Sequence, residues 1–286
     1  MDDKHIVGFD TGAVNKLADD PDRAILLPKI RSGFQVRLSA TSASELIATA
    51  DALRRSKLLT LSKELMRSGD CIHSAYQLLQ MLIRDSEVSL PFDWRLVDIR
   101  FQEAEDVLRN GVAFDDSESQ SLRDENRQAK DKFEDFHRRF NSLYAQALAE
   151  QGATRPASLG ESVERLRKSG SFDKMASALY AYVSERDPRN DPPLAAVVEN
   201  FLRACPPFLA LLLGLCAARY TRNLKAPQRP SIRAGALDTS MAVCLPYSSI
   251  FVTSDAAMER CFKEVGHLAR LPVEVVSYDW FRQRVM

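Results

Sequence analysis

Two short apolar runs near the start of the chain have the pattern of β-strands, and each leads toward a carboxylate. Residues 4–9 (KHIVGF) form the first run, which ends directly before Asp10 and is followed by a helical pattern. Residues 34–40 (FQVRLSA) alternate apolar and polar positions and predict a second strand. The hydroxyl-rich stretch 41–44 can cap a helix that contains Glu45. The sequence therefore predicts two strand-to-helix turns that each carry an acid.

The other end of the chain repeats this alternation. Residues 235–245 predict a helix, 249–253 a strand, 255–265 a second helix and 272–277 a final strand. Helices that alternate with strands favour a mostly parallel sheet covered by helices. The two ends together therefore predict an α/β core.

The middle of the chain, residues 55–232, has a different pattern. It is rich in Leu, Ala, Arg and Glu and contains no convincing alternating strand, so it is predicted to be mainly helical. A long amphipathic helix is expected over residues 117–151, because apolar residues recur there at spacings of three and four. These residues are Phe133, Phe136, Phe140, Leu143 and Ala147. We therefore expect a discontinuous core, residues 1–54 and 233–286, and a large α-helical insertion between its halves.

Four acids stand where an α/β sheet would place a ligand site: Asp10, Glu45, Asp238 and Asp255. Asp10 and Asp255 each follow a predicted strand. Glu45 and Asp238 each lie in the first turn of a predicted helix. In open α/β sheets the ligand crevice lies outside the carboxyl ends of the strands. Clustered carboxylates repel one another unless cations bridge them, and Mg²⁺ or Mn²⁺ prefers such oxygen ligands. The set predicts a metal site suited to phosphodiester hydrolysis.

Each acid also has a structural alternative. Asp is a preferred N-cap, so Asp10 and Asp255 could serve only to begin helices, and a solvated Glu in a first turn is common. The order of the four acids favours the site over four separate caps. The polar residues that flank them could position water or phosphate, or could be caps and turn residues. They are Thr11, Asn15, Ser240 and Thr253.

The segments that carry these acids resemble the PIN-domain nucleases. The matching strings are IVGFDTGAVNKL, SATSASELIATA and ALDTSMAVCLPYSSIFVTSDAAM, and the last particularly resembles a bacterial PIN-like group. The resemblance covers residues 4–54 and 233–286 and does not extend to the middle. It implies a PIN-like three-layer α/β core and a metal-dependent endoribonuclease, often the toxin of a toxin–antitoxin pair. Typical PIN domains have far shorter middles, so the insertion could reshape or block the substrate channel.

A basic stretch precedes Asp238. No acid occurs between Glu199 and Asp238, while cations and one tyrosine accumulate there. The residues are Arg203, Arg219, Tyr220, Arg222, Lys225, Arg229 and Arg233. Such residues can contact phosphates and stack on an unpaired base, although a solvated connector would have the same composition. Weaker candidates in the insertion are Arg54, Arg55, Lys57, His137, Arg138 and Arg139, because charged helix faces usually face solvent.

Composition restricts these possibilities only slightly. The 39 Lys and Arg balance the 39 Asp and Glu, so overall charge does not predict a nucleic-acid partner. The five cysteines form no C-x-x-C pair, which argues against zinc. The start of the chain does not resemble a signal peptide, and the longest apolar run, residues 206–218, is shorter than the roughly 20 residues that cross a bilayer. A cytoplasmic protein without membrane attachment is expected.

Two other classes of enzyme share single features with this chain. Asp10, Thr11 and Gly12 match the D-T-G of aspartic proteases, but those enzymes need an all-β fold, and without a second such motif only a homodimeric version would be left. Haloacid-dehalogenase phosphatases need a second Asp where Gly12 stands. A non-catalytic PIN-like scaffold that binds nucleic acid or a protein through the insertion stays open. DNA as the substrate, an antitoxin or other regulatory partner, and a homo-oligomer also stay open.

Overall fold

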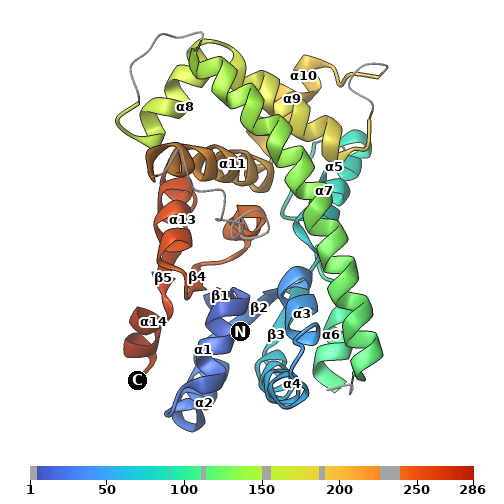
Figure 1. Ribbon diagram of the computed structural model, residues 1–286, viewed down its shortest axis with the longest axis vertical. Helices are drawn as coiled ribbons and strands as arrows, with labels where there is room; N and C mark the ends of the chain where they lie inside the picture. The colour runs from blue at the N-terminus through green and yellow to red at the C-terminus, as the bar shows by residue number, and fades with distance from the viewer. Residues whose placement is uncertain (1–4, 90, 111–113, 150–155, 187–190, 226–238) are drawn as a thin grey trace.

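The computed structural model describes residues 5–89, 91–110, 114–149, 156–186, 191–225 and 239–286 (Figure 1). Some side chains within the long helices, those of residues 221–225 among them, also lie outside this description. Of the predicted site residues, Asp238, Arg229 and Arg233 lie outside the described residues.

A five-stranded sheet, parallel throughout, forms the centre of the fold, with the strand order β3-β2-β1-β4-β5. The strands are β1 (His5–Phe9), β2 (Phe34–Ser39), β3 (Gly69–Ile72), β4 (Ile250–Thr253) and β5 (Glu274–Ser277). Two strands from each end of the chain are therefore hydrogen-bonded into one sheet, and β1 lies beside β4. This confirms the predicted α/β fold with a parallel sheet.

Helices cover both faces of the sheet, which explains why its strands are mostly apolar. Val7, Phe9 and Val252 face one apolar cluster, and Phe251 and Val275 face the other. The first cluster is covered by α1 (Thr11–Asp19), α2 (Arg23–Gly33), α3 (Ala40–Ile47), α4 (Ala52–Met66), α6 (Gln102–Asn110) and α14 (Tyr278–Val285). The second is covered by α5 (Ala75–Val88), α11 (Pro206–Lys225), α13 (Ala256–Leu268) and the 3-10 helix η1 (Met241–Tyr247).

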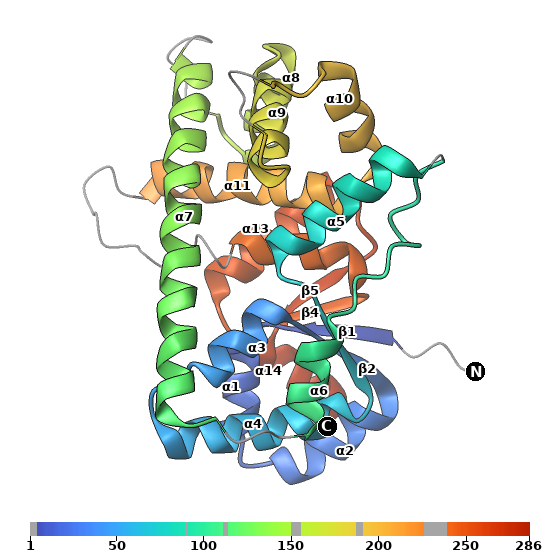
Figure 2. The ribbon, with the colours of Figure 1, turned by 90° about the vertical axis from the view of Figure 1, so that its right-hand side faces the viewer.

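A further group of helices extends the second cluster away from the sheet. It consists of α8 (Leu159–Lys168), α9 (Ser171–Val183) and α10 (Ala195–Ala204). Figures 1 and 2 show these helices beyond α11, with the long α7 (Asp116–Ala149) running from α4 at one end of the molecule to α8 and α9 at the other. Their apolar residues belong to the same cluster as Phe251 of the sheet, so the sheet and these helices share one core.

The predicted long amphipathic helix is confirmed by α7. Phe136 and Phe140 are buried, as the periodicity predicts, whereas Leu143 is 38% exposed. The side chains of Phe133 and Ala147 lie outside the description. The apolar stripe thus packs over part of its predicted length.

The prediction of no strand between residues 55 and 232 is wrong for β3. Gly69–Ile72 pairs with β2, and Asp70 lies opposite Arg37 in the register. Asp70 stands inside this four-residue strand and interrupts its apolar run, so the local pattern does not mark it. Within the predicted helix at 235–245, residues 239 and 240 are α-helical and the 3-10 helix η1 follows from Met241, while 235–238 lie outside the described residues.

The edge of β3 that is not paired with β2 is covered by the chain around Arg100. Phe101 N–H donates to the Cys71 carbonyl over 2.8 Å, and the Cys71 N–H donates to the buried Glu105 carboxylate over 3.2 Å. Burial raises the pKa of Glu105, but hydrogen bonds from Arg100 and from the Cys71 amide outweigh it and hold the pKa below its usual value. The Cys71 backbone groups at this edge are therefore already hydrogen-bonded and are not available to pair with a further strand.

Gly69 allows a close approach between β3 and β2, and its replacement by Ala is expected to destabilise the fold by about 1–3 kcal/mol. A Cβ at this position would lie 2.4 Å from the Val36 carbonyl oxygen and 3.1 Å from the Leu65 carbonyl oxygen. Both atoms are backbone and cannot rotate away. The control is Gly33→Ala, since a Cβ at Gly33 meets nothing within 4 Å. Urea unfolding should separate the two variants, and equal stability would contradict the observed strand approach.

Among the described residues, no single helix is both long enough and apolar enough to cross a bilayer. Helices α10 and α11 satisfy the criteria only as a pair, with a bend of 99° between them.

Candidate active site at the carboxyl edge of the sheet

The strand order creates a switch point between β1 and β4. From β1 the chain continues to β2 and β3 on one side, and from β4 it continues to β5 on the other. In such sheets the crevice for a ligand lies at the carboxyl ends of the two central strands. Asp10 follows β1 and Thr253 ends β4, so both lie at this crevice.

Asp10 is held in a fixed orientation there. Its side chain is largely buried, at 6% exposed, and its Oδ1 accepts a 2.5 Å hydrogen bond from the Ala13 N–H at the start of α1. Its Oδ2 accepts a hydrogen bond from the fully buried Thr253 hydroxyl. Asp10 therefore does cap a helix, as the structural alternative predicts, and it is also fixed at the switch point of the sheet.

Glu45 comes from α3, which is capped by Ser39 at the end of β2, and its side chain lies beside the residues around Asp10. The hydroxyl of Thr11 donates to Glu45 Oε2. Asp10, Thr11 and Glu45 line one small cavity of about 40 Å³, together with Gly12, Thr41, Ser42, Met241 and Met258. A cavity of this volume has room for an ion or a few water molecules. The structure thus brings together two of the four predicted acids.

Asp255 lies apart from this cavity. It is exposed and caps α13, because its Oδ1 accepts hydrogen bonds from Ala257 N–H (2.6 Å) and Met258 N–H (2.9 Å). Its own N–H donates to the Thr253 hydroxyl over 3.0 Å, so Thr253 connects the backbone of Asp255 with the carboxylate of Asp10. The Asp255 carboxylate does not line the cavity that Asp10 and Glu45 share.

Two substitutions of Asp255 separate capping from catalysis. Asn caps a helix about as well as Asp, whereas Ala loses about 1 kcal/mol of stability. If Asp255 only caps α13, Asp255→Asn keeps both stability and any cleavage activity, and Asp255→Ala loses stability alone. Loss of cleavage in Asp255→Asn with an unchanged melting temperature would instead make Asp255 a metal ligand. This geometry leads us to expect the first result.

The predicted flanking residues have differing surroundings. Thr11 and Thr253 bond directly to the acids. Asn15 donates to the Thr11 carbonyl over 2.9 Å and accepts from Arg54 over 2.8 Å, so it ties α1 to α4. Ser240 is buried at 6% exposed and lines a second, larger cavity.

The oxygen donors of the small cavity fit a divalent cation such as Mg²⁺ or Mn²⁺. Magnesium sites commonly use one or two protein carboxylates and complete their coordination with water and substrate phosphate. Asp10 and Glu45 supply two carboxylates, and Thr11, Thr41 and Ser42 supply hydroxyl groups. Across the described ranges, no three His, Cys, Asp or Glu side chains form a group that could hold one ion. Further carboxylate ligation would have to come from Asp238, which lies outside those ranges.

The basic stretch is described only at its start. The Tyr220 hydroxyl donates to the Pro156 carbonyl over 3.4 Å, and its ring packs against the second apolar cluster. The Nε of Arg219 is buried and has no hydrogen-bond partner among the described residues. The side chains of Arg222 and Lys225 lie outside the description. Nucleic-acid binding by this stretch therefore stays a prediction.

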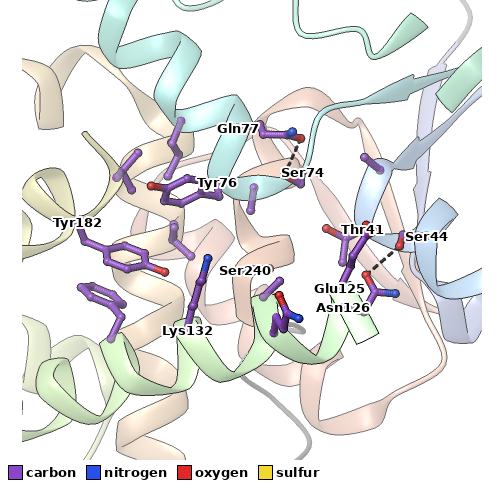
Figure 3. Close-up of a pocket in the computed structure, with 18 of the residues that line it drawn as sticks. Thr41, Ser44, Ser74, Tyr76, Gln77, Glu125, Asn126, Lys132, Tyr182 and Ser240 are labelled. Atoms are coloured by element: carbon purple, nitrogen blue, oxygen red, sulfur yellow. Dashed lines mark hydrogen bonds between the residues drawn. The ribbon is translucent and has the colours of Figure 1, made fainter. Parts of the chain in front are cut away.

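A cavity of about 1020 Å³ adjoins the acids and was not predicted from the sequence (Figure 3). Thr41 and Glu45 line both it and the small cavity, so the two spaces meet at α3. Its other walls come from α5, α7 and α9, including Tyr76, Lys132 and Tyr182. The charged face of α7 lines part of this cavity, but in the sequence alone charged residues on a helix predict contact with solvent.

Of the basic residues considered weaker candidates, Arg139 lines this larger cavity. Arg54 and Lys57 instead form ion pairs with Asp19, and the buried Arg55 pairs with Asp116. The latter three residues thus join helices within the fold.

No family model matches the chain, and neither a curated protein nor a solved structure is significantly similar to it. The resemblance to PIN domains rests on the sequence motifs alone.

Proposed function

We propose that this protein is a metal-dependent nuclease that hydrolyses phosphodiester bonds, with RNA as the favoured substrate. One observation carries the proposal: Asp10 and Glu45, which follow two different parallel strands, line one cavity beside the switch point of the sheet. The PIN-like motifs around both residues supply the expectation of RNA over DNA.

In this proposal Asp10 and Glu45 would hold Mg²⁺ or Mn²⁺, with Asp238 as a further candidate ligand. A divalent cation there supplies positive charge against the phosphate and makes a nearby water a stronger acid. The chain contributes orientation, because the Ala13 N–H and the Thr253 hydroxyl fix Asp10 while the Thr11 hydroxyl fixes Glu45. In the proposal these bonds hold both carboxylates in place before substrate binds.

A non-catalytic scaffold is the second candidate. The observation that favours it is the position of Asp255, which caps α13 outside the cavity and leaves two described carboxylates in place of the predicted set. In that case the helical part of the chain would bind nucleic acid or a protein. An antitoxin or other regulatory partner, self-association and a cytoplasmic location belong to the proposal and await their own tests.

Cleavage of end-labelled single-stranded RNA, structured RNA and single-stranded DNA by the purified chain tests the proposal. We expect cleavage of RNA with Mn²⁺ or Mg²⁺ and slower or no cleavage of DNA. Cleavage of DNA alone would support the nuclease proposal and contradict RNA as the favoured substrate. Failure to cleave any of the three by folded protein would favour the scaffold.

A further inference from the structure

The larger cavity beside Glu45 is lined by two cations that no described carboxylate neutralises directly. Lys132 and Arg139 reach it from α7, and neither forms an ion pair within the part of the chain that the structure describes. Figure 3 shows Lys132 pointing from α7 into the cavity, toward the side where Tyr76 and Tyr182 lie. Two cations without ion-pair partners among the described residues, at the wall of this open cavity, can contact an anionic group of a ligand.

Three other acids that line this cavity already have partners. Glu185 accepts hydrogen bonds from the Tyr76 hydroxyl (3.0 Å) and from the Gln80 amide (3.3 Å). Asp135 pairs with Arg138, and Glu125 accepts from the Ser121 hydroxyl over 3.4 Å. These acids keep their negative charge, but none of them pairs with Lys132 or Arg139, so both cations stay available to contact a phosphate.

Aromatic rings form one wall of the same cavity. The rings of Tyr76 and Tyr182 meet edge to face with their centroids 5.6 Å apart, and Tyr182 stacks on Phe136 at 4.2 Å with an angle of 20° between the planes. Burial and the hydrogen bond to Glu185 raise the pKa of Tyr76, so its phenol stays neutral. Aromatic faces beside free cations are the combination that binds unpaired nucleotides.

One wall of the cavity is α7, which is hydrogen-bonded to the region of α3, the helix that carries Glu45. The Ser44 hydroxyl on α3 donates to Asn126 on α7 over 2.8 Å, and Arg123 donates to the Ala48 carbonyl over 3.1 Å. Lys132 lies on the same helix six residues after Asn126, toward the aromatic wall. The acids and the aromatic wall are thus on two sides of one continuous space.

We propose that this cavity binds one unpaired nucleotide of a single-stranded nucleic acid, with its phosphate at Lys132 and Arg139 and its base against Tyr76 and Tyr182. The proposal rests on the proposed nuclease function, because it places the neighbouring phosphate toward Glu45. A base in a duplex is paired and stacked and cannot present its face to these rings. The volume of about 1020 Å³ lies at the upper end of small-ligand pockets, which is enough for a nucleotide.

Binding of a fluorescein-labelled ten-nucleotide single-stranded RNA in EDTA, followed by anisotropy, tests this site without cleavage. We expect Lys132→Ala and Tyr76→Leu each to weaken binding roughly tenfold. Tyr76→Phe keeps the ring and should stay within about twofold of the wild type. Lys130→Ala is the matched control, since Lys130 lies on the same helix but does not line the cavity. Thermal unfolding of each variant checks that the fold is intact.

The outcomes separate this inference from the proposed function. Wild-type binding that is equally strong in Lys132→Ala, Tyr76→Leu and Lys130→Ala would overturn the inference and leave the nuclease proposal standing. Cleavage without measurable binding in EDTA would overturn it as well. AMP that binds as tightly as the RNA would make the cavity a site for free nucleotides, which contradicts a strand-binding role. Folded protein that fails both to bind and to cleave any of the nucleic acids would refute the nuclease proposal itself.

Discussion

Asp10→Asn is expected to lower the rate of RNA cleavage at least about 100-fold, because losing even a group that only supports a metal ligand commonly costs 10- to 100-fold. The substitution removes the negative charge and keeps the shape of the side chain. The amide oxygen of Asn can still accept from the Ala13 N–H, so α1 keeps its cap. Stability should therefore change by less than about 1 kcal/mol. Single-turnover cleavage and thermal unfolding of the same preparation measure both quantities.

Asp51→Asn is the matched control for this variant. Asp51 caps α4 in the same manner, since its Oδ1 accepts from the Arg54 N–H over 2.7 Å, but it lies outside the small cavity. It should leave the cleavage rate unchanged. Equal cleavage by Asp10→Asn and Asp51→Asn would mean that Asp10 only caps α1. The proposed metal site would then lose one of its two described carboxylates.

Asp70→Ala is expected to give the largest loss of stability, about 3–5 kcal/mol, because it leaves a buried cation without a partner. Arg37 on β2 binds Asp70 on β3 through two hydrogen bonds, Nε to Oδ1 at 2.7 Å and Nη2 to Oδ2 at 2.6 Å. Its Nη1 also donates to the Tyr247 carbonyl over 2.7 Å, and Gln35 donates to Asp70 over 2.9 Å. The side chains of Arg37 and Asp70 are only 12% and 6% exposed. Urea unfolding of the variant measures the loss.

The double variant Arg37→Met with Asp70→Leu tests the cause of that loss. Replacing a whole buried ion pair by apolar side chains is commonly far less harmful than removing one partner. The double variant should therefore recover part of the stability lost in Asp70→Ala. A double variant less stable than Asp70→Ala would show that the ion pair itself, and the contacts it organises, stabilise the β2–β3 edge.

Apolar runs next to acids made most of the sheet predictable. Four strands were expected because each is a compact apolar segment between turn or helix signals, and the structure confirms them at 5–9, 34–39, 250–253 and 274–277. The strand β3 was not predicted because Asp70 interrupts its apolar pattern. A charge is tolerated at that position because Arg37, which is distant in sequence, pairs with it. Local pattern cannot reveal a strand whose stability depends on a distant ion pair.

The candidate site was predictable only where a strand leads directly to a side chain. Asp10 and Glu45 follow adjacent strands, so a parallel sheet necessarily brings them to the same edge. The larger cavity depends instead on how α5, α7 and α9 pack, and nothing local in the sequence fixes that packing. Lys132 on a charged helix face has the same appearance whether it faces solvent or a cavity, so its position is known only from the structure.

Removal and return of the metal test the central claim most directly. The purified wild-type chain is treated with EDTA, dialysed, and incubated with end-labelled single-stranded RNA before and after addition of Mn²⁺, with Asp10→Asn measured in parallel. The account predicts no cleavage after EDTA, recovery on addition of Mn²⁺, and no recovery in Asp10→Asn. Cleavage that persists in EDTA, or that Asp10→Asn recovers as fully as the wild type, would contradict a metal-dependent site at Asp10 and Glu45.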